Sequence, residues 1–386
     1  MTMKMKMNKI KEEKEEKKVE YLELIYDLVF VYVIGRNNSL LHQVTDGFVE
    51  GKVFFAYILC TLTIIQIWSF TTFYINMHGR NGLRDHICLF INMFLLYFIG
   101  EGTRSHWEES LLEYHVAWGL ILVNLGMQYF IELRNRGEQP EIYAQTRRMG
   151  IVLMTEAVMV LCTYPVYRAT GISLAPAAVL FGIIGAMVHG SKSTVILVDF
   201  AHLTERVMLY VVFTFGEMII ALGGYFEGGV TVNSLYFSVM CFLIVVGLFL
   251  SYGTVYDHLI DREMKTSGLV YLLIHIFLIF ALSIITTSLT FMHNDGIALL
   301  PKILMLIFSF LTYYGSLFLT LRYSKTKCRP GIRFVGLLVL AAVSFAALML
   351  LFKDSSHVHI ALSAAYVWGI CLLLHRFRKK TLAEHQ

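Results

Sequence analysis

Long apolar segments are the feature that most constrains this chain. A helix that crosses a hydrocarbon core of about 30 Å needs about 20 mainly apolar residues. Twelve segments approach that length, near residues 21–41, 53–75, 85–102, 110–131, 149–167, 172–189, 203–225, 232–255, 268–290, 299–321, 333–352 and 358–375. They lack the two-residue alternation of a membrane β-barrel strand and are about twice as long as one. The sequence therefore predicts an all-α, polytopic transmembrane bundle of about 12 spans.

Composition supports exposure to lipid. The chain of 386 residues is 57% hydrophobic and 16% charged, whereas soluble domains average about 45–50% and about 25%. The first span is the least regular, because Glu23 and Asp27 interrupt its start and Arg36 its end. Residues 1–19 are charged and contain no apolar region that ends in a cleavage site, so we expect a cytoplasmic tail rather than a signal peptide.

The distribution of basic residues predicts the orientation. Of the 32 Lys and Arg residues, 25 fall on one side of the predicted spans. Six fall on the other side: Arg36, Lys52, Arg104, Arg168, Lys302 and Lys353. Arg206 alone lies inside a span. Because cytoplasmic loops carry an excess of Lys and Arg, we expect a multi-pass protein with both termini in the cytoplasm.

The span positions also suggest an internal repeat. A shift of 182 residues carries the first six span starts close to the last six, and it aligns Glu23 with Glu205 and Tyr74 with Tyr256. Six is an even number, so the two halves would have the same orientation, as in parallel transporter repeats. The predicted organisation is a tail (1–19), two six-span repeats (20–191 and 192–376) and a second cytoplasmic tail (377–386). Coincidental regular spacing is the alternative.

Ionisable residues inside the spans form two clusters. A charge at the bilayer centre costs about 2.5–3.5 kcal/mol, so such residues have partners or functions. The first cluster lies in the first span and the second in the seventh, at matching places in the two repeats. The candidate site residues are Glu23, Asp27, His202, Glu205, Arg206 and Glu217. They would line a transport path, or a carboxylate of one half could pair with Arg206 and merely hold two helices together.

Other polar residues within or beside the spans form a secondary set of candidates. They are Gln66, Trp68, Asn92, Glu156, Tyr256, Asp257 and His275. Single buried residues of this kind are more often structural than functional. The six cysteines occur singly, and the chain contains no phosphate-binding loop, dinucleotide glycine pattern or zinc-protease motif. We therefore expect no metal site and no cofactor.

Two of these segments resemble a known family. The stretch from Leu22 to Val31 is similar to the E-L-F-F-D-L-V-F-V signature that opens proteins of the bacterial low-temperature-requirement A family. His202-Leu203-Thr204-Glu205-Arg206 and the later Phe215-Gly216-Glu217 resemble its H-x-x-E-R and L-G-E segments, although Phe215 replaces a leucine and Met208 a glycine. The resemblance covers about residues 19–290. It implies a polytopic protein of the bacterial plasma membrane, linked by name to growth in the cold, without an established molecular activity.

A second resemblance is shorter. Residues 26–30, Tyr-Asp-Leu-Val-Phe, look like the F-S-D-x-V-F start of the lysosomal potassium/proton channel family, which is also built from six-span repeats. The family's Arg and Ser are missing at the matching places. This resemblance implies ion conduction only weakly.

These observations favour a transport protein, either a channel or a permease for a cation, a proton or a small solute. Its path would lie between the two repeats. We expect contact with membrane lipids, no binding of nucleic acid, and assembly into a homo-oligomer as an open alternative to a monomer. The second hypothesis is a membrane-embedded enzyme acting on a lipid or isoprenoid, or a lipid-homeostasis factor without catalysis. Its basic rim, which includes Arg134, Arg147 and Lys325, would hold anionic headgroups.

Overall fold

The computed structural model describes residues 18–42, 44–45, 47–103, 110–134, 140–191, 198–293, 296–352 and 355–383. The expected charged tail, except for residues 18 and 19, and most of the linker between the halves lie outside these ranges. The helices of the first half are α2 (Tyr21–Asn38), α3 (Gly51–His78), α4 (Leu83–Gly102), α5 (Leu111–Leu133), α6 (Pro140–Thr170) and α7 (Ala175–Ser191). Those of the second half are α8 (Phe200–Ala221), α9 (Val232–His258), α10 (Leu269–Met292), α11 (Leu299–Leu319), α12 (Ile332–Leu351) and α13 (Ser356–Ala383). A two-stranded antiparallel hairpin, β1 (Val44–Thr45) and β2 (Phe48–Val49), follows α2.

These helices confirm the all-helical, polytopic class. Within the described residues, ten of them are long and apolar enough to cross a membrane. Two helices are not among the ten. Helix α2 carries Glu23, Asp27 and Arg36, and the apolar stretch of α7, Ala175–Val188, is shorter. The number of twelve spans therefore stays a prediction.

Two helices extend beyond the apolar segments that predicted them. Helix α6 begins nine residues before the expected span at 149, and α13 continues to Ala383, past the expected end at 375. The sequence bounds followed hydropathy. Backbone hydrogen bonding within a helix does not require apolar side chains, so these helices continue into polar sequence.

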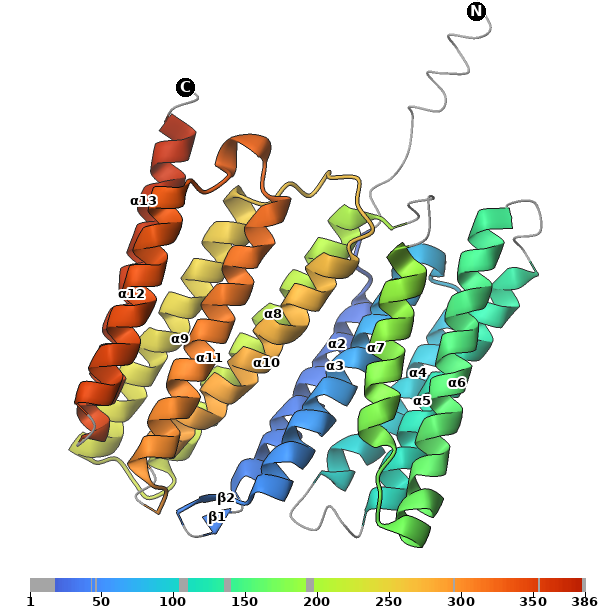
Figure 1. Cartoon of the computed structure of the whole chain (residues 1–386), viewed down its shortest axis with the longest axis horizontal. Helices are drawn as coiled ribbons and strands as arrows, with labels where there is room; N and C mark the ends of the chain where they lie inside the picture. The colour runs from blue at the N-terminus through green and yellow to red at the C-terminus, as the bar shows by residue number, and fades with distance from the viewer. Residues whose placement is uncertain are drawn as a thin grey trace, which may run out of the picture.

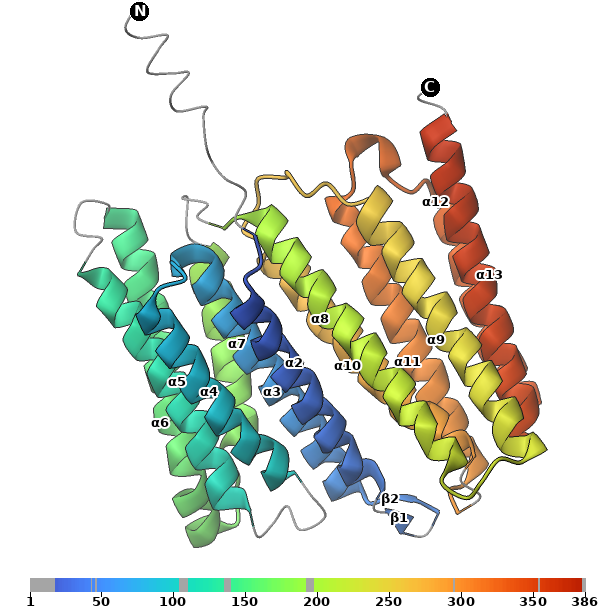
Figure 2. The same ribbon diagram turned by 180° about the vertical axis from the view of Figure 1, so that it is seen from behind.

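The helices stand side by side and form two groups, α2–α7 and α8–α13 (Figures 1 and 2). The start of α2 and the end of α13 lie at the same end of the bundle, which we call the terminal face. The β1–β2 hairpin lies at the other end, the opposite face. Helices α2 and α3 of the first group contact α8 and α10 of the second, and we call this contact the seam.

Helix neighbours recur in the two groups. Helix α2 packs on α3 and α4, and α8 packs on α9 and α10. The pairs α4–α5, α5–α6, α6–α7 and α3–α7 have the counterparts α10–α11, α11–α12, α12–α13 and α9–α13. This correspondence agrees with a shift of six helices.

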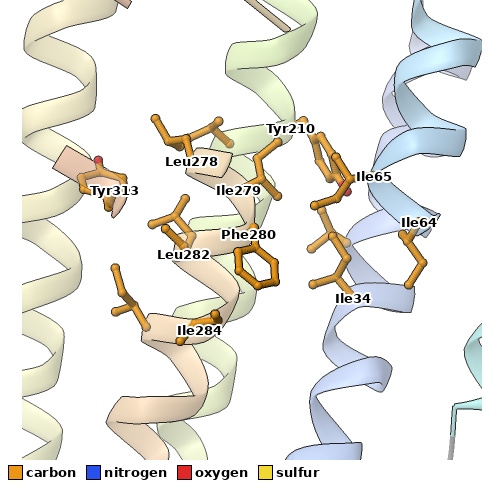
Figure 3. Close-up of a cluster of buried hydrophobic side chains, with 14 of the residues drawn as sticks. Ile34, Ile64, Ile65, Tyr210, Leu278, Ile279, Phe280, Leu282, Ile284 and Tyr313 are labelled. Atoms are coloured by element: carbon orange, nitrogen blue, oxygen red, sulfur yellow. The ribbon is translucent and has the colours of Figure 1, made fainter. Parts of the chain in front are cut away.

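Apolar side chains close the middle of the seam. Figure 3 shows Phe280 of α10 facing Ile34 of α2 and Ile65 of α3, with Tyr210 of α8 and Ile279 beside them. All five side chains are buried. We call these five residues the apolar layer. Interdigitated packing of this kind leaves little space for water.

Candidate functional site

A buried ion cluster joins the halves between the apolar layer and the terminal face. Arg206 of α8 donates from Nη2 to Asp27 Oδ1 (3.0 Å) and from Nε to Asp27 Oδ2 (3.3 Å). Its Nη1 lies 3.2 Å from Oε2 of Glu23. Arg206 and Asp27 are fully buried, and Glu23 is 4% exposed. A two-bonded Arg–carboxylate pair is among the strongest side-chain contacts and fixes the relative position of α2 and α8.

His202 completes this cluster. It is also buried, and its Nε2 lies 3.4 Å from Glu23 Oε2. Asn76 Oδ1 accepts from the Asp199 amide (2.9 Å), so its Nδ2 must be the donor to Asp199 O and to His202 Nδ1 (3.1 Å). This hydrogen-bond network assigns the histidine proton to Nε2, where it faces Glu23. We call Glu23, Asp27, His202 and Arg206 the seam cluster.

The start of α8 holds His202 in place. Asp199 is the N-cap of α8, and its Oδ1 accepts from the His202 amide at 3.1 Å. A capping carboxylate satisfies one of the otherwise unpaired N–H groups of the first turn. Asn76 of α3 binds both the amide and the carbonyl of Asp199. Because of these contacts, α3 determines where α8 begins and how His202 is oriented.

Trp68 belongs to this site, although the sequence placed it among the secondary positions. Its indole Nε1 donates to Asp27 Oδ1 at 2.7 Å, and its ring lies 4.4 Å from that of Tyr210. Asn76 was not predicted as a site residue. The available signal was its position eight residues after Trp68, which places both on one face of α3.

The charges of the seam cluster do not balance while His202 is neutral. Two carboxylates then face one guanidinium among these four side chains. Burial of charge in an apolar interior is costly, so additional positive charge near Glu23 and Asp27 is favoured. A proton on a carboxylate would supply this charge, whereas Nδ1 of His202 already accepts from Asn76. Among the described residues, no group of three or more His, Cys, Asp or Glu side chains is arranged to hold a metal ion.

Two polar cavities approach the seam from opposite ends. A cavity of about 650 Å³ at the terminal face reaches Glu23 and is also lined by Glu20 and Arg80. A cavity of about 490 Å³ at the opposite face reaches Asn38 and contains Glu217. Glu217 follows Arg206 by eleven residues, about 16 Å along the helix. It therefore lies apart from the seam cluster, beyond the apolar layer.

A glycine accommodates Glu217. A methyl group on Gly35 of α2 would lie 2.5 Å from Glu217 Oε1, so a side chain at position 35 would displace this carboxylate. Thr286 and Thr287 also line the cavity around Glu217. This acid is thus held at the seam, within reach of the opposite face.

A hydrogen-bonded layer separates this second cavity from the apolar layer. Ser283 of α10 donates to Asn38 Oδ1 (2.8 Å) and lies 2.9 Å from the Tyr57 hydroxyl. Asn37 donates to the Tyr57 carbonyl (3.2 Å) and to Thr61. From the terminal face, the seam therefore presents an ion cluster, an apolar layer and a polar layer in sequence.

The structure places several predicted residues away from the seam cluster. Glu205 lies close enough to Tyr256 to interact with it electrostatically, and Arg262 lies 5.0 Å above the Tyr256 ring. Asp257 is exposed. His275 is buried in the second half, where its Nδ1 donates to the Tyr271 carbonyl at 2.8 Å.

The remaining secondary candidates lie within the first half. Asn92 of α4 accepts from Asn124 Nδ2 at 2.7 Å. Gln66 donates to the Val179 carbonyl at 3.2 Å, and Glu156 of α6 is fully buried beside it. None of these groups contributes a hydrogen bond or ion pair to the seam cluster within the described part of the chain.

A second ion network was not predicted. Glu132 of α5 is fully buried and accepts from Arg84 Nη2 (2.6 Å) and Arg80 Nη2 (3.1 Å). Arg84 also donates to the Tyr74 hydroxyl at 3.1 Å. In the sequence, Arg80 and Arg84 are simply two of the 25 basic residues on one side of the predicted spans. Since Arg80 lines the terminal-face cavity, this network forms part of its wall.

This arrangement defines a class of protein: a polytopic α-helical membrane protein with a buried ion cluster between two helix groups. Its family is also established. The sequence profile described as "Bacterial low temperature requirement A protein (LtrA)" matches residues 18–368, and the chain belongs to this family. The match extends past residue 290, where the motif resemblance ended, into α13. No curated protein and no solved structure matches the chain significantly.

Proposed function

We propose that this protein is a transporter or channel for a cation, a proton or a small solute, with its path along the seam. The observation that carries the proposal is the pair of polar cavities that approach the seam from opposite faces, one reaching Glu23 and the other Glu217. Intramembrane acids beside water-accessible cavities are typical of ion and proton pathways. The structure would correspond to a closed state, because the apolar layer separates the two cavities.

In this proposal the seam cluster is the site in the path that binds the transported ion or solute. Its two carboxylates would attract a cation or a proton, and Arg206 reduces the repulsion between Glu23 and Asp27. Binding would change the attraction between α2 and α8. The seam is the contact between the halves, so a rocking movement of one against the other would open it from either side.

A parallel 6 + 6 repeat with twelve spans is part of this proposal. The recurring helix neighbours support it. The offset of 182 residues that aligns Tyr74 with Tyr256 also aligns Arg80 with Arg262. Both tyrosines lie beside arginines at the terminal face. We assign this face to the cytoplasm of a plasma membrane because it carries most of the Lys and Arg residues.

Flux through purified protein in liposomes tests this function, with pH-sensitive and potassium-sensitive dyes under an imposed gradient. We expect Asp27→Asn and Glu217→Gln each to lower flux at least about tenfold, equivalent to about 1.4 kcal/mol in the rate-limiting barrier. Glu205→Gln is the matched control, because Glu205 neighbours Arg206 in sequence but lies beside Tyr256. Wild-type flux in both test variants would refute the path. A well-folded wild type without flux would favour the lipid hypothesis instead.

A further inference from the structure

Another buried acid of the first half, Glu156, lies away from the seam cluster. Glu156 of α6 is fully buried, and among the described residues the amide of Gln66 on α3 is the group that interacts with its carboxyl. Among the described residues, no charged group of α3, α5 or α7 acts on it. Glu156 faces Gly182 of α7, and the nearby Val179 carbonyl of the same helix accepts from Gln66.

Helix α7 is shaped around this pair. A methyl group on Gly182 would overlap both Glu156 Oε2 and Gln66 Nε2. The absence of a side chain therefore creates the space that the two polar groups share. The acid and the amide therefore lie together against the backbone of α7 at Gly182.

The pair lies between two further cavities. One cavity, of about 110 Å³, is lined by Tyr129 and Gln145 toward the terminal face and by Gln66 at its inner end. The other, of about 500 Å³, is lined by Lys52 toward the opposite face and reaches Thr63. Thr63 and Gln66 are three residues apart, about 4.5 Å along α3.

Helix α6 shows the same order. Met149 lines the first cavity and Thr163 the second, and Glu156 lies seven residues from each. The acid is therefore midway between spaces that approach it from the two faces of the membrane. Within the described chain, no Asp or Glu lines either cavity, and Glu156 is the buried acid between them.

We propose that Glu156 and Gln66 form a proton-binding site within the first half. An ionised carboxylate in an apolar interior without a cation is strongly disfavoured, so the neutral acid is the stable form there. Binding consists of one proton passing from water to a carboxylate oxygen, with no other bond changed. The proton exchanges through whichever cavity is hydrated. Neither residue belongs to the seam cluster, although the first cavity also borders α10 through Leu272 and Ile276.

Infrared spectroscopy of the full protein in lipid tests the site directly. At neutral pH we expect a protonated-carboxyl C=O band that is lost in Glu156→Gln and that shifts after transfer to D₂O. The isosteric amide replaces a neutral acid, so helicity and expression should match the wild type. A carboxyl band that persists in Glu156→Gln would overturn the proposal. So would a wild-type band that never responds to D₂O.

Two alanine variants separate proton binding from packing. Gly182→Ala intrudes on the acid–amide pair, whereas Gly185→Ala on the same helix meets an apolar partner, Val152, at 2.8 Å. We expect only Gly182→Ala to shift the carboxyl band. Equal shifts in both variants would mean that the band reports general packing and would refute the site. Because the band is read without flux, failure of the seam path would leave this result unchanged.

Discussion

Replacement of Arg206 by methionine tests the seam cluster most directly. The variant keeps an unbranched apolar side chain but leaves the carboxylates of Glu23 and Asp27 buried without their cation. Removal of one partner from a buried ion pair costs about 3–5 kcal/mol. At 1.4 kcal/mol for each factor of ten, the unfolding constant should rise between about 10² and about 4 × 10³.

Related variants divide this loss into its parts. Arg206→Lys keeps the charge but loses the two-bond geometry, so we expect a smaller loss, about 1.5–3 kcal/mol. The triple variant Glu23→Gln, Asp27→Asn and Arg206→Met removes all three charges and should recover more than half of the stability. Acidification should also reduce the loss in Arg206→Met, because protons then neutralise the two carboxylates.

The assay is unfolding of purified protein in detergent, followed by loss of helicity with increasing denaturant. Arg262→Met is the control, since that exposed arginine lies over the Tyr256 ring, a contact worth about 0.5–1 kcal/mol. Wild-type stability of Arg206→Met would refute the reasoning. So would a triple variant that is no more stable than Arg206→Met, because the loss would then not come from unpaired carboxylates.

Three further variants test the surroundings of the seam. Trp68→Phe keeps an aromatic ring but loses the indole bond to Asp27, so unfolding should show a loss of about 1.5–3 kcal/mol; unchanged stability would contradict the bond. Gly35→Ala should displace Glu217 and lower liposome flux while helicity is kept; wild-type flux would show that this contact has no role. Glu132→Gln leaves two arginines facing an amide and should cost about 1–3 kcal/mol in the same unfolding assay; a change below about 0.5 kcal/mol would make the network structurally neutral.

Hydropathy predicted where the helices lie because lipid imposes one requirement on every span. It could not predict which polar groups meet. Glu205 and Arg206 are adjacent in sequence but differ by about 100° around α8, so one faces Tyr256 and the other Asp27. The sequence placed both residues in one candidate cluster and could not separate them. Only packing against α2 and α9 does so.

Uncharged and terminal groups were the hardest to recognise. Asn76 carries no charge, so its position in a span raised no strong energetic conflict, yet it orients His202. Glu132 lies at the end of an apolar segment, where an acid can reach the headgroup region at low cost. Its partners Arg80 and Arg84 come from a different part of the chain. A single sequence does not show that these segments meet.

The charge of α2 has a consequence for how the protein is made. This helix carries Glu23, Asp27 and Arg36, and it is not among the helices that are apolar enough to span a membrane by themselves. The arginine that compensates its acids is synthesised about 180 residues later, on α8. Stable insertion of the first helix must therefore wait for the second half to leave the ribosome. During that interval α2 would stay at the membrane surface or with an insertion factor, and truncation before Arg206 should leave it there.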